Sequence, residues 1–301
     1  FETARRHALN ALAGRDERPD EIADDLLRAA AFLPPYDRSA YGTREGLRGA
    51  DAARVRAHRH AAFSADGAIL AVVGRVDVSE ALDAAEAALG GWSAGASARP
   101  PRTPRRYAPP ARHRRDLDAE QAQLAWLWPA LPPADPDADA ARLAVAVLGD
   151  GPGSRLFDEV RERRGLVYGV SAELREAAEA AWIEIGAQAT PARAAEVEAT
   201  VAAIVAGMSD GPTEDEVLRA RIRLATDDAL TAETPAGRAA QIVHDARTLG
   251  VVRSVDARLR GWDALDRDRV ARAWSRTSPA QATRLIAGPG IGSPKPRIRR
   301  G

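Results

Sequence analysis

Two stretches of the sequence resemble each other, and this repeat limits the folds open to the chain. Residues 1–33 align with residues 217–249 at a constant offset of 216, and the match continues with a drift of two positions. Both copies keep the order helix, proline break, helix, helix, strand and glycine, which favours a duplication over chance. The matched pairs include Phe1 with Val217, Ala4 with Ala220, Arg5 with Arg221, Pro19 with Pro235, Val55 with Val270 and Gly74 with Gly288.

The repeat predicts how the chain is divided. Residues 116–216 precede the second copy and have no counterpart before Phe1, so we expect one complete repeat preceded by half of another. The length of 301 residues also exceeds one average domain. The predicted division is residues 1–92 as the C-terminal half of a first domain, 93–115 as a linker rich in Pro, Arg and Ser, 116–290 as a complete second domain, and 291–301 as a basic tail.

Local patterns predict the main elements. The apolar run at 69–74, ended by glycine, favours a central strand, and alternation at 121–128 and 180–187 predicts two more strands. Thr213 and Glu216 have the spacing of a capping box, which predicts a helix start.

Composition excludes several classes of function. The formal net charge is zero, which gives no support to binding of nucleic acid or of an anionic membrane. Of the 43 basic residues only Lys295 is a lysine, and we interpret the excess of Arg and Ala as the codon bias of a GC-rich genome. The absence of cysteine excludes disulfides, thiolate metal sites and a cysteine nucleophile. No apolar run approaches the roughly 20 residues of a membrane span, so we expect a soluble protein, of the cytoplasm or the periplasm.

Residues 149–170 contain the main candidate site residues of the chain. Its glycines predict a tight turn, and Ser154 is expected to cap the amphipathic helix that follows. Gly165 is expected to end this helix, and the apolar residues after it predict a strand opening in which Tyr168 points inward or into a cleft. Arg161 and Tyr168 are thereby placed at one helix–strand junction.

Other kinds of functional site have weaker support in the sequence. The glycine turn lacks the Gly-Lys-Ser/Thr and GxGxxG patterns of phosphate-binding loops. His58 and His60 lie in a helical context, where they point about 200° apart, and are expected at the surface. Asp245 beside His244 gives no nucleophile–base pattern.

The motif Ser154-Arg155-Leu156-Phe157, followed by residues 161–168, resembles the second-domain signature of the insulinase-like zinc metallopeptidases, the pitrilysin and mitochondrial processing peptidase family. The resemblance implies an α+β fold of duplicated domains, each an antiparallel sheet with helices packed on it. It also implies that Arg161 and Tyr168 hold the substrate backbone and support the oxyanion across a cleft from zinc. The alternative is that Arg161 lies on a solvated helix face and Tyr168 in the core. The resemblance further includes Pro35-Tyr36, Gly42, Gly74, Gly91-Trp92, Gln121, Thr213 and Glu216.

The zinc site of that family needs an HxxEH motif and a later glutamate ligand. HxxEH does not occur in this sequence. Because the chain opens on Phe1 without a start methionine, we expect the true N-terminus upstream, and the resemblance places HxxEH roughly 75–80 residues before Glu2. Glu2 aligns with the third ligand of the family. The resemblance thus implies zinc in the complete enzyme or in a partner subunit, and none bound by this chain alone.

Two hypotheses follow from these patterns. In the first, the chain is most of an insulinase-like peptidase, or its peptidase-like partner, and binds extended peptides in an interdomain cleft without hydrolysing them alone. The partner would be an HxxEH-bearing subunit or a second copy. In the second, the chain is a non-proteolytic assembly or binding subunit that shares the fold.

Overall fold

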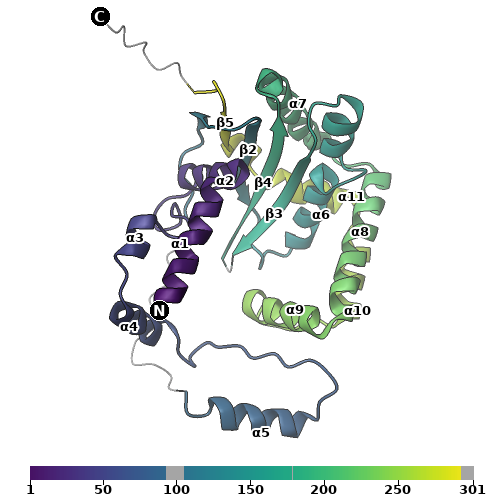
Figure 1. The fold of residues 1–301 in the computed structure, drawn as a ribbon. Coiled ribbons are helices and arrows are strands. Elements are labelled where there is room, and N and C mark those ends of the chain that lie inside the picture. The colour runs from purple at the N-terminus through teal and green to yellow at the C-terminus, as the bar shows by residue number, and fades with distance from the viewer. Residues whose placement is uncertain (93–104, 178, 293–301) are drawn as a thin grey trace, which may run out of the picture.

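The computed structural model describes residues 1–92, 105–177 and 179–292 and has an α+β fold built on one sheet (Figure 1). The strand order is β1-β5-β2-β4-β3. β1 pairs with β5 in parallel, and the other neighbours are antiparallel. The strands are β1 (Arg112–Asp116), β2 (Ala122–Ala130), β3 (Val170–Ala177), β4 (Ala180–Ala189) and β5 (Thr283–Gly288).

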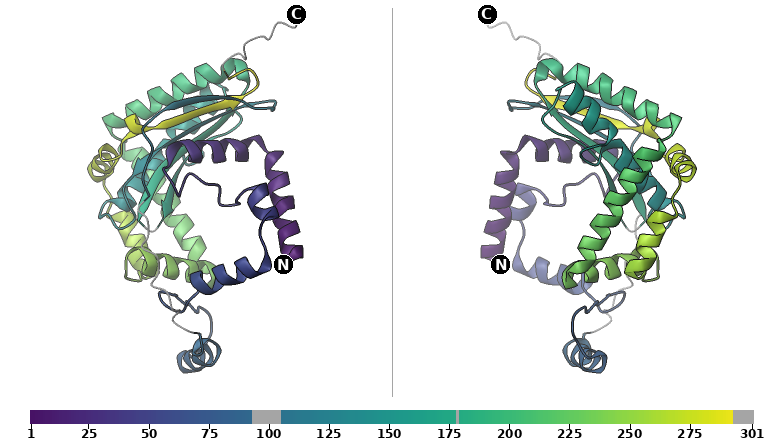
Figure 2. Two further views of the ribbon diagram at one scale, coloured as in Figure 1. Left: turned by 90° about the vertical axis from the view of Figure 1, so that its left-hand side faces the viewer. Right: turned by 90° about the vertical axis from the view of Figure 1, so that its right-hand side faces the viewer.

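The larger core lies on one face of this sheet. Along β2, Leu124, Trp126 and Trp128 point to this face, because successive side chains of a strand alternate. The helices that cover it run above the sheet and down its side in Figure 2. They are α6 (Ala138–Gly149), α7 (Ala194–Gly207), α8 (Glu214–Glu233) and α11 (Arg267–Ser275), with α9 (Pro235–Thr248) and α10 (Val255–Asp263) continuing from α8.

A helix of the N-terminal unit covers part of the opposite face. α2 (Pro19–Ala31) packs Leu27 and its buried alanines, with Phe32, against Leu127, Trp182 and Leu285 of three strands. This second cluster joins the predicted first domain to the sheet of the second. The remaining N-terminal helices are α1 (Glu2–Asp16), α3 (Arg44–Arg48), α4 (Ala52–Ala62) and α5 (Val78–Leu89), and α5 stands apart from the sheet in both figures.

Tyr107 fastens the chain entering the sheet to this junction. It forms an isolated bridge with Phe32, and its hydroxyl donates to the carbonyl of Ala181 at 2.8 Å. The ring of Phe32 lies 5.3 Å from those of Tyr107 and Trp182. Burial raises the pKa of Tyr107 to about 12, despite the nearby Arg105.

We expect Tyr107→Phe to lower the free energy of unfolding by about 1 kcal/mol at neutral pH, because the Ala181 carbonyl loses its hydrogen bond. A tyrosine whose pKa is higher in the folded state stabilises the fold fully below its unfolded pKa of about 10 and loses this contribution as the pH rises toward 12. The difference between the two proteins, measured by urea unfolding, should therefore shrink above about pH 10. A pH-independent difference would contradict this account.

Two helix starts agree with the predicted repeat. Pro19 and Pro235, which the alignment matches, each occupy the first position of a helix, α2 and α9. The capping box is confirmed, since the Thr213 hydroxyl accepts from the Glu216 amide and Glu216 accepts from the Thr213 amide. The α+β class is confirmed as well, with one parallel pair in the sheet. No helix in the described ranges is long and apolar enough to cross a membrane.

Two predictions for the N-terminal unit and the linker are wrong. Residues 69–74 form no strand, and Leu70 is 59% exposed. The repeat alignment matches this segment with β5, which lies between β1 and β2. No strand of the described chain lies beside residues 69–74, and an extended segment without a hydrogen-bonded partner strand does not form a strand. The second difference is strand β1, which begins at Arg112 inside the predicted linker. The sequence did not predict this strand because its pairing with β5 uses backbone groups, whereas its charged side chains gave no strand pattern. Residues 93–104 of that linker, and 293–301 of the predicted tail, lie outside the described residues.

Candidate functional site at the junction of the glycine turn and the sheet

The turn after α6 is built as the glycines predict. Gly151 and Gly153 have φ values of +74° and +82°, which side-chain-bearing residues rarely adopt. The predicted cap at Ser154 is wrong, because its hydroxyl donates to the Gly151 carbonyl at 2.6 Å instead of accepting from the helix. The carboxylate of Asp158 accepts from the Gly153 amide at 3.2 Å. Internal hydrogen bonds therefore hold the turn.

Arg155 attaches this turn to the start of α8. Its guanidinium pairs with both carboxylate oxygens of Glu216, at 2.7 and 2.9 Å, and donates to the carbonyls of Gly207 and Gly211. Burial would raise the pKa of Glu216, but the hydrogen bonds from Arg155 and Thr213 outweigh it and hold the pKa below its usual range. Such a forked, partly buried pair fixes the position of the segment that follows.

Arg161 lies on that segment. Residues Phe157–Arg163 form a π-helical turn (η1), a geometry frequent at functional sites, and Val160 anchors it in the core. The guanidinium of Arg161 stands 4.7 Å from the centre of the Phe157 ring, and its ion pair with Glu162 spans 3.7 Å. Its side chain is 45% exposed. Arg161 is thus positioned by a rigid turn and retains hydrogen-bonding capacity.

Tyr168 lies seven positions further on, and of its two expected orientations, inward or into a cleft, the structure excludes the inward one. Its side chain is 82% exposed, so the alternative that it belongs to the core is wrong. Leu166 and Val167 before it, and Val170 after it, are buried and fix the backbone on both sides. β3 starts at Val170 and not at Leu166, and this removes Tyr168 from the alternation on which the inward prediction depended.

The residues expected near a metal do not converge. Glu2 is exposed and pairs with Arg5, and His58 and His60 lie on the exposed helix α4, as expected for surface residues. No group of three or more His, Cys, Asp or Glu side chains that could hold a metal ion occurs in the part of the chain that the structure describes. The described residues thus do not by themselves make up a zinc site, and ligation by Glu2 stays a prediction.

A groove that sequence reasoning missed begins at Gly169, the residue that follows Tyr168. It has a volume of about 460 Å³ and separates the first turns of α2 from the sheet face of β2, β4 and β3. We call it the α2 groove. Its polar lining residues include Asp20, Asp24, Gln123, Glu173, Arg175 and Glu184. The sequence signal for this groove was Gln123, a polar residue at a position of strand β2 whose side chain is buried.

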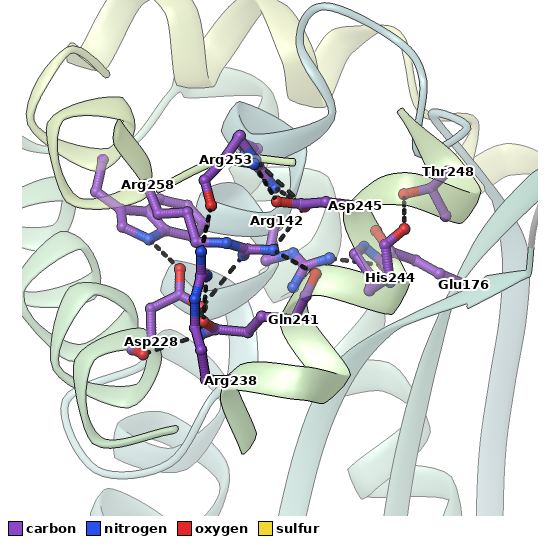
Figure 3. Close-up of polar contacts among 12 residues, drawn as sticks. Arg142, Glu176, Asp228, Arg238, Gln241, His244, Asp245, Thr248, Arg253 and Arg258 are labelled. Carbon is purple, nitrogen blue, oxygen red and sulfur yellow. Dashed lines mark hydrogen bonds and ion pairs between the residues drawn. The ribbon is translucent and has the colours of Figure 1, made fainter. Parts of the chain in front are cut away.

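A buried charge cluster, also missed, joins α9 to α10 (Figure 3). Asp245 is fully buried and accepts from the backbone and guanidinium of Arg253 and, at 2.6 Å, from Arg258. Burial opposes ionisation, but these hydrogen bonds hold the pKa of Asp245 below its usual range. His244 points elsewhere, with its Nε2 3.9 Å from Glu176 Oε2, and burial lowers its pKa although Glu176 opposes this. His244 and Asp245 therefore form no catalytic pair.

Solved structures of other proteins share this fold. A structure of a peptidase M16 inactive domain from Pseudomonas fluorescens covers 98% of this chain, and 71% of its own, with a TM-score of 0.85 at 21% identity. A chain in the structure of complex III2 from Candida albicans with Inz-5 bound covers 94% and 70%, with a TM-score of 0.82 at 14% identity. At such identities the likeness shows the fold.

Sequence similarity identifies the family of the chain. A protein of Mycobacterium leprae named an uncharacterized zinc protease is 30% identical over 222 residues, which are 71% of this chain and 49% of that protein. The chain thus spans about half of the length of this relative. Residues 50–224 match the family described as the peptidase M16 inactive domain. Because this match extends over more than half of the sequence and agrees with the fold, the chain belongs to the peptidase M16 inactive-domain family.

Proposed function

We propose that this chain is the non-catalytic, peptide-holding part of a zinc peptidase, and that Arg161 and Tyr168 contact the backbone of an extended peptide. The observation that carries the proposal is their shared placement. A half-exposed arginine on η1 and an exposed tyrosine just before the edge strand β3 both stand on backbone fixed by buried neighbours. Exposed side chains on a rigid scaffold are typical of binding sites.

The chemistry of the two residues supports peptide binding. The guanidinium of Arg161 is a planar donor with no acceptor, and peptide carbonyls are its complement. The phenol of Tyr168 donates one hydrogen bond and would stabilise negative charge that develops on a carbonyl oxygen. In the complete enzyme the zinc would lie on an HxxEH-bearing segment, either upstream in the same polypeptide or in a partner subunit, which a second copy would provide if the full chain carries the motif. The zinc there would supply Lewis-acid activation, while this chain orients the peptide.

We expect Arg161→Ala to weaken binding of a labelled, extended peptide to the 301-residue chain by about tenfold, and Tyr168→Phe by about threefold. Fluorescence anisotropy with a peptide of about ten residues measures this directly. Arg247→Ala, on the last turn of α9, is the matched control and should leave the affinity unchanged. Unchanged affinity in both site variants would contradict the proposal and favour the alternative that Arg161 only lies on a solvated helix face.

A second candidate is the assembly or binding subunit without a proteolytic role. The observation that favours it is the apolar surface of residues 55–92, where Phe63, Leu70, Val78 and Leu82 are each more than half exposed. Large exposed apolar side chains are more frequent at interaction sites than elsewhere on a surface, so this segment is a candidate interface. In that case Leu82→Ser would abolish a stable complex with a partner in size-exclusion chromatography, and the Arg161 variant would change neither the complex nor peptide affinity.

A further inference from the structure

A pocket of about 300 Å³ lies between α7 and the core face of the sheet, where α7 runs across the strands above β5 (Figure 2). We call it the α7 pocket. It is lined by Trp126 and Trp128 of β2, by Val201 and Val205 of α7, and by a single 3₁₀ turn, η4 (Pro279–Gln281), which precedes β5. The lining is mainly apolar, and the volume lies at the lower end of the range of small-molecule sites.

The α7 pocket has a positive charge without a counter-charge. Arg284 of β5 lines it and lies directly opposite Trp126 of β2, so both side chains are on the core face of the sheet. The guanidinium of Arg284 forms no ion pair or hydrogen bond with any described residue. The carboxylate of Glu198 on α7 pairs instead with Arg112, the neighbour of Arg284 on β1. No carboxylate of the described chain lines the pocket, so the pocket favours a negatively charged group.

A buried N–H group in the lining has no acceptor. Trp128 is 1% exposed, and its indole Nε1 is buried without a hydrogen-bond partner among the described residues. The ring of Trp274 packs against this indole edge to face, with the ring centres 6.3 Å apart, and holds it in place. An unpaired buried donor lowers stability, so a ligand atom that accepts its hydrogen bond gains affinity. The unpaired indole therefore points to a ligand independently of the charge on Arg284.

We propose that the α7 pocket binds a small apolar monocarboxylate, a molecule with a hydrocarbon body and one carboxylate. The carboxylate pairs with the guanidinium of Arg284 and accepts a hydrogen bond from Trp128 Nε1, and the hydrocarbon body lies against Trp126 and the aliphatic side chains of α7. This site goes beyond the proposed function, because neither Arg161 nor Tyr168 belongs to its lining.

The charge requirement is tested by isothermal titration calorimetry of the 301-residue chain with octanoate and with its neutral isostere octanamide. We expect octanoate to bind about tenfold more tightly than octanamide. Arg284→Gln should abolish this preference, and Arg284→Lys should keep part of it because the positive charge remains. Arg247→Gln, which removes a charge from the distant helix α9, is the matched control and should keep the whole preference (Figure 1).

The location of the site is tested by filling the pocket. Ala202 of α7 lines the pocket and is partly exposed, so leucine at this position occupies the pocket without entering the packed core. We expect Ala202→Leu to weaken octanoate binding by about tenfold, because the hydrocarbon body loses its place. Ala195→Leu, at an exposed position of the same helix outside the lining, should leave the affinity unchanged. Circular dichroism shows that each variant remains folded.

The hydrogen bond to Trp128 has a spectroscopic readout of its own. The chain contains six tryptophans, and in isotope-labelled protein the indole N–H signal of Trp128 is assigned by its loss in Trp128→Phe. Octanoate should move this signal downfield, because the indole then donates to the carboxylate. Acetylleucine, which ends as the C-terminus of a peptide does, is titrated in parallel. We expect octanoate to bind more tightly, and the reverse order would overturn the free acid as the ligand.

Three other results would overturn the α7 pocket as a carboxylate site. The first is the absence of octanoate binding, or equal affinity for octanoate and octanamide. The second is octanoate affinity that survives in both Arg284→Gln and Ala202→Leu, since the acid would then bind elsewhere. The third is an indole signal of Trp128 that stays in place while octanoate binds.

Discussion

Replacing Asp245 with asparagine is expected to lower the free energy of unfolding by about 3 kcal/mol, because it leaves the guanidinium of Arg258 buried without its main counter-charge. Arg258 is 8% exposed, and its other carboxylate, Asp228, is 3.6 Å away, against 2.6 Å for Asp245. Asparagine keeps the volume of the side chain. The loss therefore reports the ion pair and its hydrogen bonds rather than a cavity.

Urea unfolding measures this loss, and Asp256→Asn is the matched control. Asp256 lies on α10, the helix that carries Arg258, and is exposed. Its replacement should change the free energy of unfolding by less than about 0.5 kcal/mol. The pH dependence adds a second readout. Because the pKa of Asp245 is lowered in the folded state, its contribution is present above its unfolded pKa of about 3.9 and is lost as the pH falls further. If the two variants were equally stable, the cluster would contribute nothing to the fold.

Gly149→Val is the second substitution expected to have a large effect, about 3 kcal/mol or more of lost stability. A Cβ at this position would lie 2.6 Å from the backbone nitrogen and the Cβ of Ala172, and 2.9 Å from Leu156. Ala172 is held in the β3–β4 ladder and cannot move without breaking it. The clash therefore separates α6 from the edge strand and displaces the glycine turn.

Gly207→Ala is the control for Gly149→Val. Gly207 is also the last residue of a helix, α7, but a Cβ there meets no atom within 4 Å. We expect this variant to be as stable as the parent or more stable by about 0.5 kcal/mol, because alanine favours the helix. Both variants are compared by thermal unfolding. A Gly149→Val protein with unchanged stability would show that α6 and β3 are not in close contact.

Much of the fold could be predicted from the sequence because it depends on short-range patterns. The proline pair at 19 and 235, the capping box at Thr213, and the alternation along β2 each determine local structure, and the structure confirms them. The peptidase-family resemblance was carried by the stretch 154–168 and is confirmed by the match over residues 50–224. The division into two domains stays a prediction.

The features that could not be predicted depend on contacts between distant segments. The apolar run at 69–74 has the composition of a strand, but strand formation requires a partner that local sequence does not specify. The α2 groove unites α2 with β2 and β3, and the Asp245 cluster joins α9, α10 and α6, so neither leaves a motif in the sequence. The exposure of Tyr168 depends on where β3 begins, and strand boundaries are weakly encoded.

The central claim, that Tyr168 and Arg161 face a bound peptide, is tested most directly by crosslinking. Replacing Tyr168 with the photoreactive residue p-benzoylphenylalanine keeps an aromatic ring at an exposed position. Irradiation with a biotinylated extended peptide should give a covalent adduct at position 168, reduced by an excess of unlabelled peptide and by Arg161→Ala. The same photoreactive residue at Val251, an exposed site after α9, should give none. Equal labelling at both positions, or none at 168, would contradict the claim.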